Sequence, residues 1–232
     1  FLEKFCVNFV ILIYNMKARL NIPNQLSEIT LRKYQKFVKL NVEDADERFL
    51  QIKMIEIFCE VSHENVLKIK FADADRVTAI LGEMFTQKPD LVTKFWLNGV
   101  QYGFIPDLDE LSFGEYIDLD TYLGDWENIH TAMNVLYRPI TENKGNRYSI
   151  EEYDVNTKDR LLDMPLDAVI SSVFFFYHLG KDLSVVMNRY LKEEMKKIPS
   201  QQKQDLMLNG DGIKQFSHSL KEILEDLNIS LS

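Results

Sequence analysis

The chain has 232 residues and a mass of 27.2 kDa, with 46% hydrophobic and 27% charged residues. This length and composition are typical of a globular protein with a buried core, which excludes a disordered chain and a collagen-like one. Asp and Glu outnumber Lys and Arg by 36 to 27, so the net charge is −9. Because general nucleic-acid binders carry a basic face, we expect no nucleic-acid partner. The chain contains two cysteines, Cys6 and Cys59, which are too few for a disulfide scaffold, so we expect a reducing compartment.

The first fifteen residues differ in character from the rest of the chain. They contain an apolar run over residues 5–14 that only Asn8 interrupts, and a run of this length is too short for a bilayer, which takes about 20 residues. The run lacks a signal-peptide cleavage site, and we expect no membrane association. We predict that Met16 is the natural initiator and that residues 1–15 are an upstream extension outside the fold. The alternative is a hydrophobic N-terminal strand or anchor.

Helical signals follow over residues 30–88. Thr30 can cap a helix over residues 31–40, and Asp44 with Glu47 resembles a capping box that opens a helix to about residue 60. Apolar residues cover most of the circumference of this second helix, so we predict that it is central and buried. A third helix is indicated by apolar residues at helical spacing, namely Val77, Ile80, Leu81, Met84 and Phe85.

The dipeptide Asn98-Gly99 gives the strongest short-range signal in the chain. Both residues tolerate a positive φ, which favours a two-residue type I′ turn between antiparallel strands within residues 92–105. Asn98 and Gly99 are therefore the residues critical for this turn. The turn would pair Leu97 with Val100, Phe95 with Tyr102 and Thr93 with Phe104. One side of this hairpin is then almost wholly apolar, and because a hairpin alone is unstable in water, we expect helices to cover it.

The remainder of the chain is predicted to be helical. Ser112 and Glu115 form a capping box for a helix through residue 123, and a helix from residue 125 ends at Arg138-Pro139. Two further helices are separated by Gly180, residues 199–211 read as a polar linker, and residues 212–229 read as a C-terminal amphipathic helix. The predicted fold is mainly α with one β-hairpin, an α+β class, in which residues 16–198 form one domain of helices packed over the Asn-Gly hairpin.

No motif of catalytic chemistry occurs in the sequence. Phosphate-binding glycine loops, serine-hydrolase elbows and zinc-protease motifs are absent, and the four histidines and two cysteines are scattered singly. We therefore expect no catalytic residue, no cofactor, no metal and no enzymatic activity. Cys59 lies in the most apolar helix, so we expect a buried thiol with a raised pKa.

Residues 107–127 form an unusual acidic segment. They contain eight acids and no Lys or Arg, and so contribute −8 of the net charge of −9. Three interpretations remain open: helix capping with a solvated surface, a docking surface for a basic partner, and a site for a hard cation such as Ca²⁺ or Mg²⁺. The spacing does not fit a calcium-binding loop of the EF-hand type. The residues proposed for docking are Asp107, Asp109, Glu110, Asp118, Asp120 and Arg138. Arg138 can also reach back to the acids in a structural pair.

Three longer strings resemble a known group of proteins. FWLNGVQYGFIPDLDELSFGEYIDLDTYL, WENIHTAMNVLYRPI and VISSVFFFYHLG are similar to proteins of a structural gene module in tailed phages of Bacteroidota, especially the crAss-like phages. The resemblance covers about residues 16–191. The hairpin followed by helices also resembles phage tail-assembly chaperones, at the level of fold.

The resemblance implies a non-enzymatic virion or assembly protein, either a minor structural protein or one similar to a tail-assembly chaperone. Its partners would be other phage structural or assembly proteins, and it would act in the cytoplasm of the bacterial host during assembly or in the virion. Two alternatives use the carboxylates of residues 107–127. One is a small metal-dependent enzyme, and the other is an acidic decoy that mimics nucleic acid to block a host defence protein.

Overall fold

The computed structural model describes residues 7–13, 16–40, 46–145 and 147–194, together with His218 and Lys221. Over these ranges the protein has the predicted α+β fold, in which helices pack with a small antiparallel sheet. The predicted linker 199–211 and C-terminal helix 212–229 lie outside the described residues, apart from His218 and Lys221. Among the described helices, none is long and apolar enough to cross a membrane.

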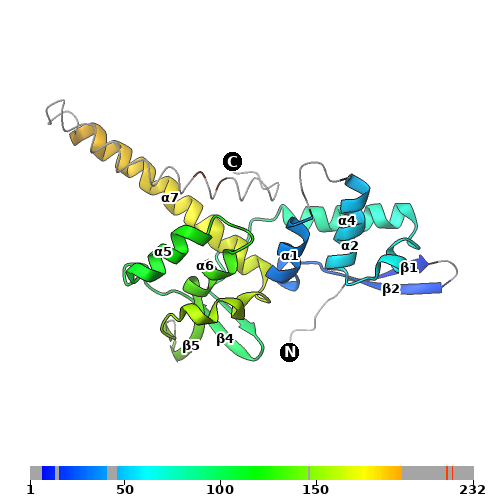
Figure 1. The fold of residues 1–232 in the computed structure, drawn as a ribbon, viewed down its shortest axis with the longest axis horizontal. Coiled ribbons are helices and arrows are strands. Elements are labelled where there is room, and N and C mark those ends of the chain that lie inside the picture. Colours follow the sequence, from blue (N-terminus) through cyan, green and yellow to red (C-terminus); the bar gives the residue numbers. More distant parts are fainter. Residues whose placement is uncertain are drawn as a thin grey trace.

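The N-terminal half contains a strand hairpin followed by helices (Figure 1). Its elements are β1 (Val7–Ile13), β2 (Met16–Ile22), the 3-10 turn η1 (Leu26–Glu28), α1 (Leu31–Val38), α2 (Glu47–Phe58), α3 (His63–Val66) and α4 (Phe71–Phe85). β1 pairs antiparallel with β2 along its whole length, from Val7 opposite Ile22 to Ile13 opposite Met16. Residues 7–13 therefore form a strand, as in the strand alternative, but this strand pairs with β2 alone. That residues 1–15 lie outside the folded domain stays a prediction.

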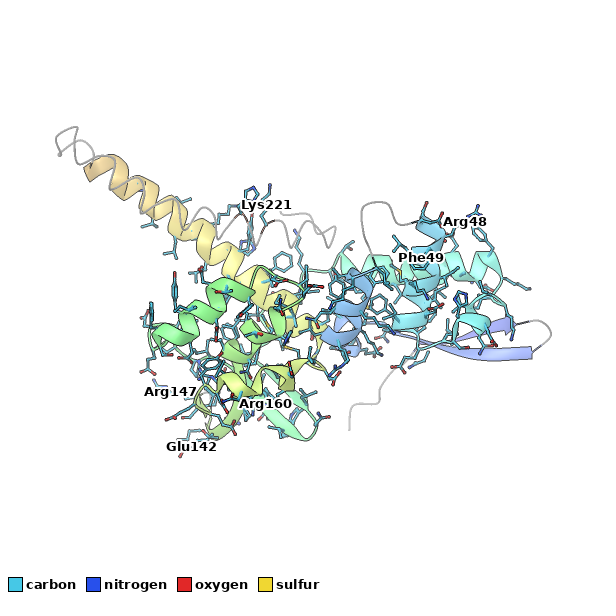
Figure 2. The ribbon with its side chains drawn as sticks, viewed as in Figure 1. Arg48, Phe49, Glu142, Arg147, Arg160 and Lys221 are labelled. Carbon is cyan, nitrogen blue, oxygen red and sulfur yellow. The ribbon has the colours of Figure 1, made fainter. Side chains whose placement is uncertain are left out.

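The N-terminal helix α1 begins as predicted, whereas α2 differs from its prediction. The Thr30 hydroxyl caps α1 by accepting a backbone N–H at 3.4 Å. The cap of α2 is Asp46, whose carboxylate accepts a backbone N–H at 3.0 Å, whereas the predicted cap, Asp44, lies outside the described residues. α2 is also less buried than predicted, since Phe49 is 41% exposed and lies at the outer edge of the helix (Figure 2). Burial is confined to the C-terminal turns of α2, at Ile55, Ile57 and Phe58.

The four-stranded antiparallel sheet follows the chain order β3-β4-β5-β6. Its strands are β3 (Lys94–Leu97), β4 (Val100–Phe104), β5 (Tyr137–Lys144) and β6 (Arg147–Ile150). The predicted turn between β3 and β4 is confirmed, with φ of 51° at Asn98 and 80° at Gly99. The predicted facing pairs are confirmed as well: Leu97 with Val100, and Phe95 with Tyr102. The backbone N–H of Phe104 donates to the Thr93 carbonyl at 2.9 Å, which continues the same pairing.

Strands β5 and β6 were not predicted. The helix before them ends at Leu136, and Tyr137 already has extended backbone angles, with φ of −122° and ψ of 119°. Since the residue before a proline is driven out of the helical region, Arg138 before Pro139 favours this change to a strand. β5 then pairs with β4, where Arg138 lies opposite Gly103.

The other elements of the C-terminal half are helical. They are α5 (Phe113–Tyr122), α6 (Ile129–Leu136), the 3-10 segment η2 (Val155–Leu161) and α7 (Leu166–Glu194). α7 is one continuous helix of 29 residues, which corrects the prediction that Gly180 divides two helices. A single glycine inside a helix costs only about 1 kcal/mol relative to alanine, so the neighbouring residues carry the helix through it.

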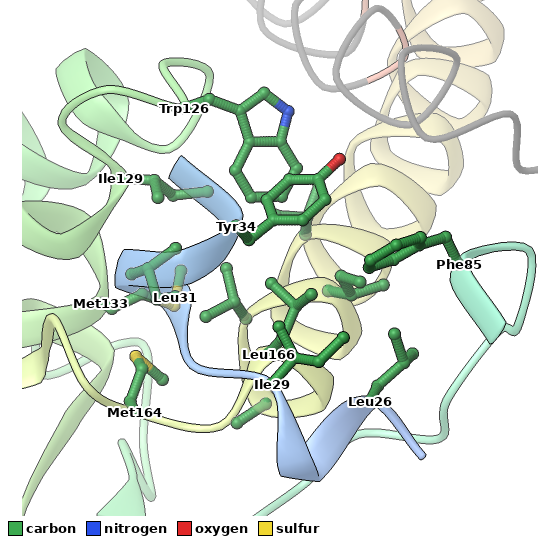
Figure 3. Packing of buried hydrophobic residues seen from close by; sticks show 14 of the residues in the cluster. Leu26, Ile29, Leu31, Tyr34, Phe85, Trp126, Ile129, Met133, Met164 and Leu166 are labelled. Carbon is green, nitrogen blue, oxygen red and sulfur yellow. The ribbon is translucent and has the colours of Figure 1, made fainter. Parts of the chain in front are cut away.

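The core lies where α1, α4, α6 and the first half of α7 meet (Figure 3). Tyr34 of α1 stands between aromatic rings, 5.5 Å from the ring of Phe85 and 4.8 Å from that of Trp126. The sheet is tied to the same core by Tyr137, whose hydroxyl donates to the Val92 carbonyl at 2.7 Å and lies 3.0 Å from the Ser172 hydroxyl of α7. The base of the hairpin contacts α7, because the ring of Phe104 lies 5.6 Å from that of Phe175, whereas Val100 at the turn is 42% exposed. The predicted helical cover therefore reaches only the base of the hairpin.

Candidate protein-docking site

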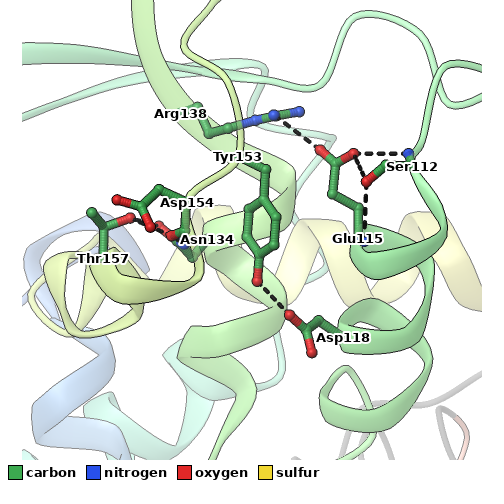
Figure 4. A network of polar contacts seen from close by, with 8 residues as sticks. All are labelled: Ser112, Glu115, Asp118, Asn134, Arg138, Tyr153, Asp154 and Thr157. Carbon is green, nitrogen blue, oxygen red and sulfur yellow. Dashed lines mark hydrogen bonds and ion pairs between the residues drawn. The ribbon is translucent and has the colours of Figure 1, made fainter.

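The acidic segment begins α5 with the predicted capping box. The Ser112 hydroxyl accepts the backbone N–H of Glu115 at 3.3 Å, and the Glu115 carboxylate accepts the backbone N–H of Ser112 at 2.8 Å. The Ser112 hydroxyl also donates to this carboxylate at 2.6 Å. Figure 4 shows these bonds at the start of the helix. Glu115 therefore satisfies backbone groups that the first turn would otherwise leave without partners.

The second carboxylate oxygen of Glu115 forms an ion pair with Arg138. The guanidinium Nη1 of Arg138 lies 2.9 Å from Glu115 Oε1, and each side chain is 8% exposed (Figure 4). Burial lowers the pKa of Arg138, and the nearby Glu115 carboxylate opposes this shift. The predicted structural pair between Arg138 and the acidic segment is confirmed. Because it is buried, Arg138 is not part of an exposed docking surface, which corrects its assignment as a docking residue.

Two more acids of the segment are engaged in local structure. Asp118 accepts a hydrogen bond from the Tyr153 hydroxyl, whose pKa is raised by burial and by this carboxylate. Asp125 accepts the backbone N–H of Glu127 at 2.9 Å and the side-chain amide of Asn128 at 2.7 Å. These contacts support the capping interpretation for this part of the segment, and they remove Asp118 from the freely exposed carboxylates.

The remaining five acids are exposed, and one of them, Glu127, pairs with Lys39 at 3.4 Å. Asp107 accepts the backbone N–H of Asp109 at 2.9 Å and so shapes the loop before α5. Asp109, Glu110 and Asp120 are exposed and form no ion pair with any described residue. Within the described part of the chain, no three His, Cys, Asp or Glu side chains are grouped closely enough to hold a metal ion.

Large apolar side chains stand among these acids on the outer side of α5. Phe113 is 79% exposed, Tyr116 57% and Ile117 44%. Their spacing of i, i+3 and i+4 places all three on one side of the helix, and Asp120 follows one turn later on that side. We call Phe113, Tyr116 and Ile117 the apolar ridge. The opposite side of α5 is buried at Leu119, so the ridge is additional to the residues that pack the helix onto the core.

A groove lies next to the loop that leads into α5. Its volume is about 720 Å³, and it is lined by residues of β4, β6, α7 and the loop, and by the residue before β3, namely Thr93, Phe104, Ile105, Pro106, Asp107, Leu108, Asp109, Arg147, Tyr148 and Phe175. We call it the loop groove. Tyr148 shapes its wall by donating to the Phe104 carbonyl at 2.6 Å. Gly103 permits this arrangement, because a Cβ there would lie 2.4 Å from the Tyr148 ring.

No family model, curated protein or solved structure matches the chain.

The predicted docking residues therefore divide between two roles. Asp107 and Asp109 line the loop groove, and Glu110 and Asp120 lie near the ridge in sequence, whereas Asp118 and Arg138 hold α5 in place. The ridge itself was missed. Its signal was present, because Phe113, Tyr116 and Ile117 add a second apolar side to a helix that already has Leu119 and Leu123 for its core contacts.

Proposed function

We propose that this protein is a non-enzymatic assembly protein that binds another protein through the apolar ridge and the loop groove. The observation that carries the proposal is the ridge, since Phe113, Tyr116 and Ile117 expose a contiguous apolar surface on one helix. Contiguous exposed apolar patches rimmed by polar residues mark interaction sites in globular proteins. Aromatic side chains also dominate the binding energy of protein interfaces.

The charges around the ridge define the partner. Glu110 and Asp120 lie near the ridge in the sequence, and Asp107 and Asp109 line the loop groove together with Arg147. Asp109, Glu110 and Asp120 form no ion pair with a described basic side chain. A complementary partner carries apolar residues flanked by Lys or Arg, as an amphipathic basic helix does. Burial of the Phe113 ring would stabilise such a complex by about 1.5–3 kcal/mol, and the acids would raise the association rate.

A designed peptide tests this surface directly. The probe is a fluorescein-labelled helical peptide with Leu at helical spacing and Lys at all other positions, and binding is measured by fluorescence anisotropy. The comparison peptide has Glu in place of Lys. We expect the basic peptide to bind and the acidic one not to bind, and we expect Phe113→Ser to weaken binding about 10-fold or more, equivalent to about 1.4 kcal/mol.

The matched control is Phe71→Ser. Phe71 is 74% exposed, close to the 79% of Phe113, but it lies on α4, so its replacement should leave binding unchanged. Changing Asp109 and Asp120 to Asn should slow association and reduce its dependence on salt, because exposed charges are screened over about 8–10 Å at physiological ionic strength. The proposal is contradicted if Phe71→Ser weakens peptide binding as much as Phe113→Ser does, or if the acidic peptide binds as tightly as the basic one.

We further propose that the natural partners are phage structural or assembly proteins, as the resemblance to crAss-like phage proteins implies. The exposed acids suit a partner with a basic surface. The test is pairwise co-expression with the products of neighbouring genes, comparing the wild type with Phe113→Ser and Phe71→Ser. A partner that binds the wild type and Phe71→Ser but not Phe113→Ser supports the proposal. Binding that is insensitive to Phe113 refutes it.

A further inference from the structure

The second half of α7 presents an apolar stripe that the rest of the described chain leaves exposed. Figure 1 shows this half of the helix extending away from the body, past α5. Leu183 is 48% exposed and Val186 59% exposed, and the half-buried Leu179 lies one turn before Leu183. The next position in the series, Tyr190, continues the spacing in the sequence. Residues 179, 183, 186 and 190 follow the alternating steps of four and three that form the seam of a coiled coil.

The charges beside this stripe are self-complementary. Asp182 and Arg189 are both exposed, and they occupy equivalent positions one heptad apart on the same side of the seam. In an antiparallel pair of such helices, Leu183 of one copy meets Val186 of the second, and Asp182 of one copy lies beside Arg189 of the second. The two-fold axis repeats every contact, so the arrangement gives two ion pairs.

A parallel pair would lack this complementarity. In a parallel pair, Asp182 of one helix would lie beside the positions of residues 180 and 187 of the other helix. These residues are Gly and Met, and neither carries a charge. The antiparallel arrangement also places the two bodies at opposite ends of the paired helices, since each α7 leaves its own body at the N-terminal end. Steric and electrostatic arguments therefore favour the same orientation.

We propose that the protein forms an antiparallel homodimer through residues 179–190 of α7. The seam joins the body at a second groove of about 450 Å³, which Leu179 and Asp182 line together with Phe174 and His178. The end of the second copy's helix lies over this groove, because residue 179 of one copy faces residue 190 of the other. The seam spans about 18 Å of helix at 1.5 Å per residue, which predicts a small and reversible interface.

Sedimentation equilibrium of the full chain tests the dimer. Since small interfaces bind weakly, the range runs from about 5 to about 300 µM. The mass should rise from 27.2 kDa toward twice that value. Val186→Lys should abolish the rise, and the matched control Val185→Lys should not, because Val185 is similarly exposed at 53% but lies on another side of the helix.

Charge exchange tests the orientation. Asp182→Arg and Arg189→Asp should each weaken the dimer at least about 10-fold by placing like charges together, and the double variant should restore it. Circular dichroism and thermal melting check that each variant is folded. A wild type that stays monomeric up to the highest concentration overturns the proposal, including the case in which residues 212–229 of the same chain cover the stripe. The proposal is also overturned if the double variant does not recover dimer formation, or if Val185→Lys dissociates the dimer.

Discussion

Glu115→Gln isolates the charge of the buried ion pair that fixes α5. The side-chain carbonyl of glutamine can still accept the backbone N–H of Ser112, so the capping box is retained. The substitution leaves the guanidinium of Arg138, which is 7% exposed, without its ionic partner at 2.9 Å. Its Nε already has no hydrogen-bond partner. An uncompensated buried charge costs about 3–5 kcal/mol, a large part of the roughly 5–15 kcal/mol by which a domain is stable.

Urea unfolding followed by tryptophan fluorescence, to which the buried Trp126 and the exposed Trp96 both contribute, measures this loss. With a slope of about 1–3 kcal/mol per molar urea, the midpoint should fall by about 1–5 M. The control is Glu142→Gln, which breaks an exposed pair at 2.7 Å to Lys144 and should cost less than about 1 kcal/mol. Figure 2 shows Glu142 at the outer edge of the sheet. Equal effects of the two substitutions would refute the buried-pair argument.

A second variant separates the charge from other effects. Adding Arg138→Met to Glu115→Gln removes the buried cation and keeps an apolar side chain in its place. The double variant should recover about 2 kcal/mol or more relative to Glu115→Gln, since the two residues interact directly. No recovery would mean that the loss comes from the α5 cap and not from the unpaired guanidinium.

Three other predictions follow from local features. Gly99→Val should lower the free energy of unfolding by about 1–3 kcal/mol, because φ is 80° there. The control Gly82→Ala, within α4, should not be destabilising. An unchanged free energy of unfolding for Gly99→Val would contradict the two-residue turn. Burial raises the pKa of the Cys59 thiol from 9.0 to about 12. In a Cys6→Ser background, thiol labelling at pH 8 should therefore be about 1000-fold slower in the native protein than in urea, because the thiolate is the reactive form. Equal rates would show an accessible thiolate. Deletion of residues 1–15 should lower stability by less than about 2 kcal/mol by denaturant midpoint, since β1 pairs with β2 alone in its sheet; a larger loss would make β1 part of the core.

The sequence determined those elements whose signal is local. Asn98-Gly99 specifies a turn by the backbone angles of two residues, and Ser112 with Glu115 specifies a helix start by bonds within one turn. Thr30 does the same for α1. Such features depend on neighbours in the chain, so they can be read without knowledge of the fold. The pairing of Arg138 with an acid was also foreseeable, because the acidic segment precedes it by one helix.

Tertiary structure decided the features that depend on distant partners. Residues 137–144 form a strand because β4 offers hydrogen-bonding groups to them, and Gly103 leaves room for Tyr148 from β6. The exposure of Phe49 on α2 and of Phe113 on α5 likewise depends on which side of each helix the rest of the chain covers. An apolar residue at helical spacing looks the same in the sequence whether it packs in the core or faces a partner. The arrangement of the other elements alone distinguishes these cases, and it leaves the ridge on α5 and the stripe on α7 uncovered by the described part of the chain.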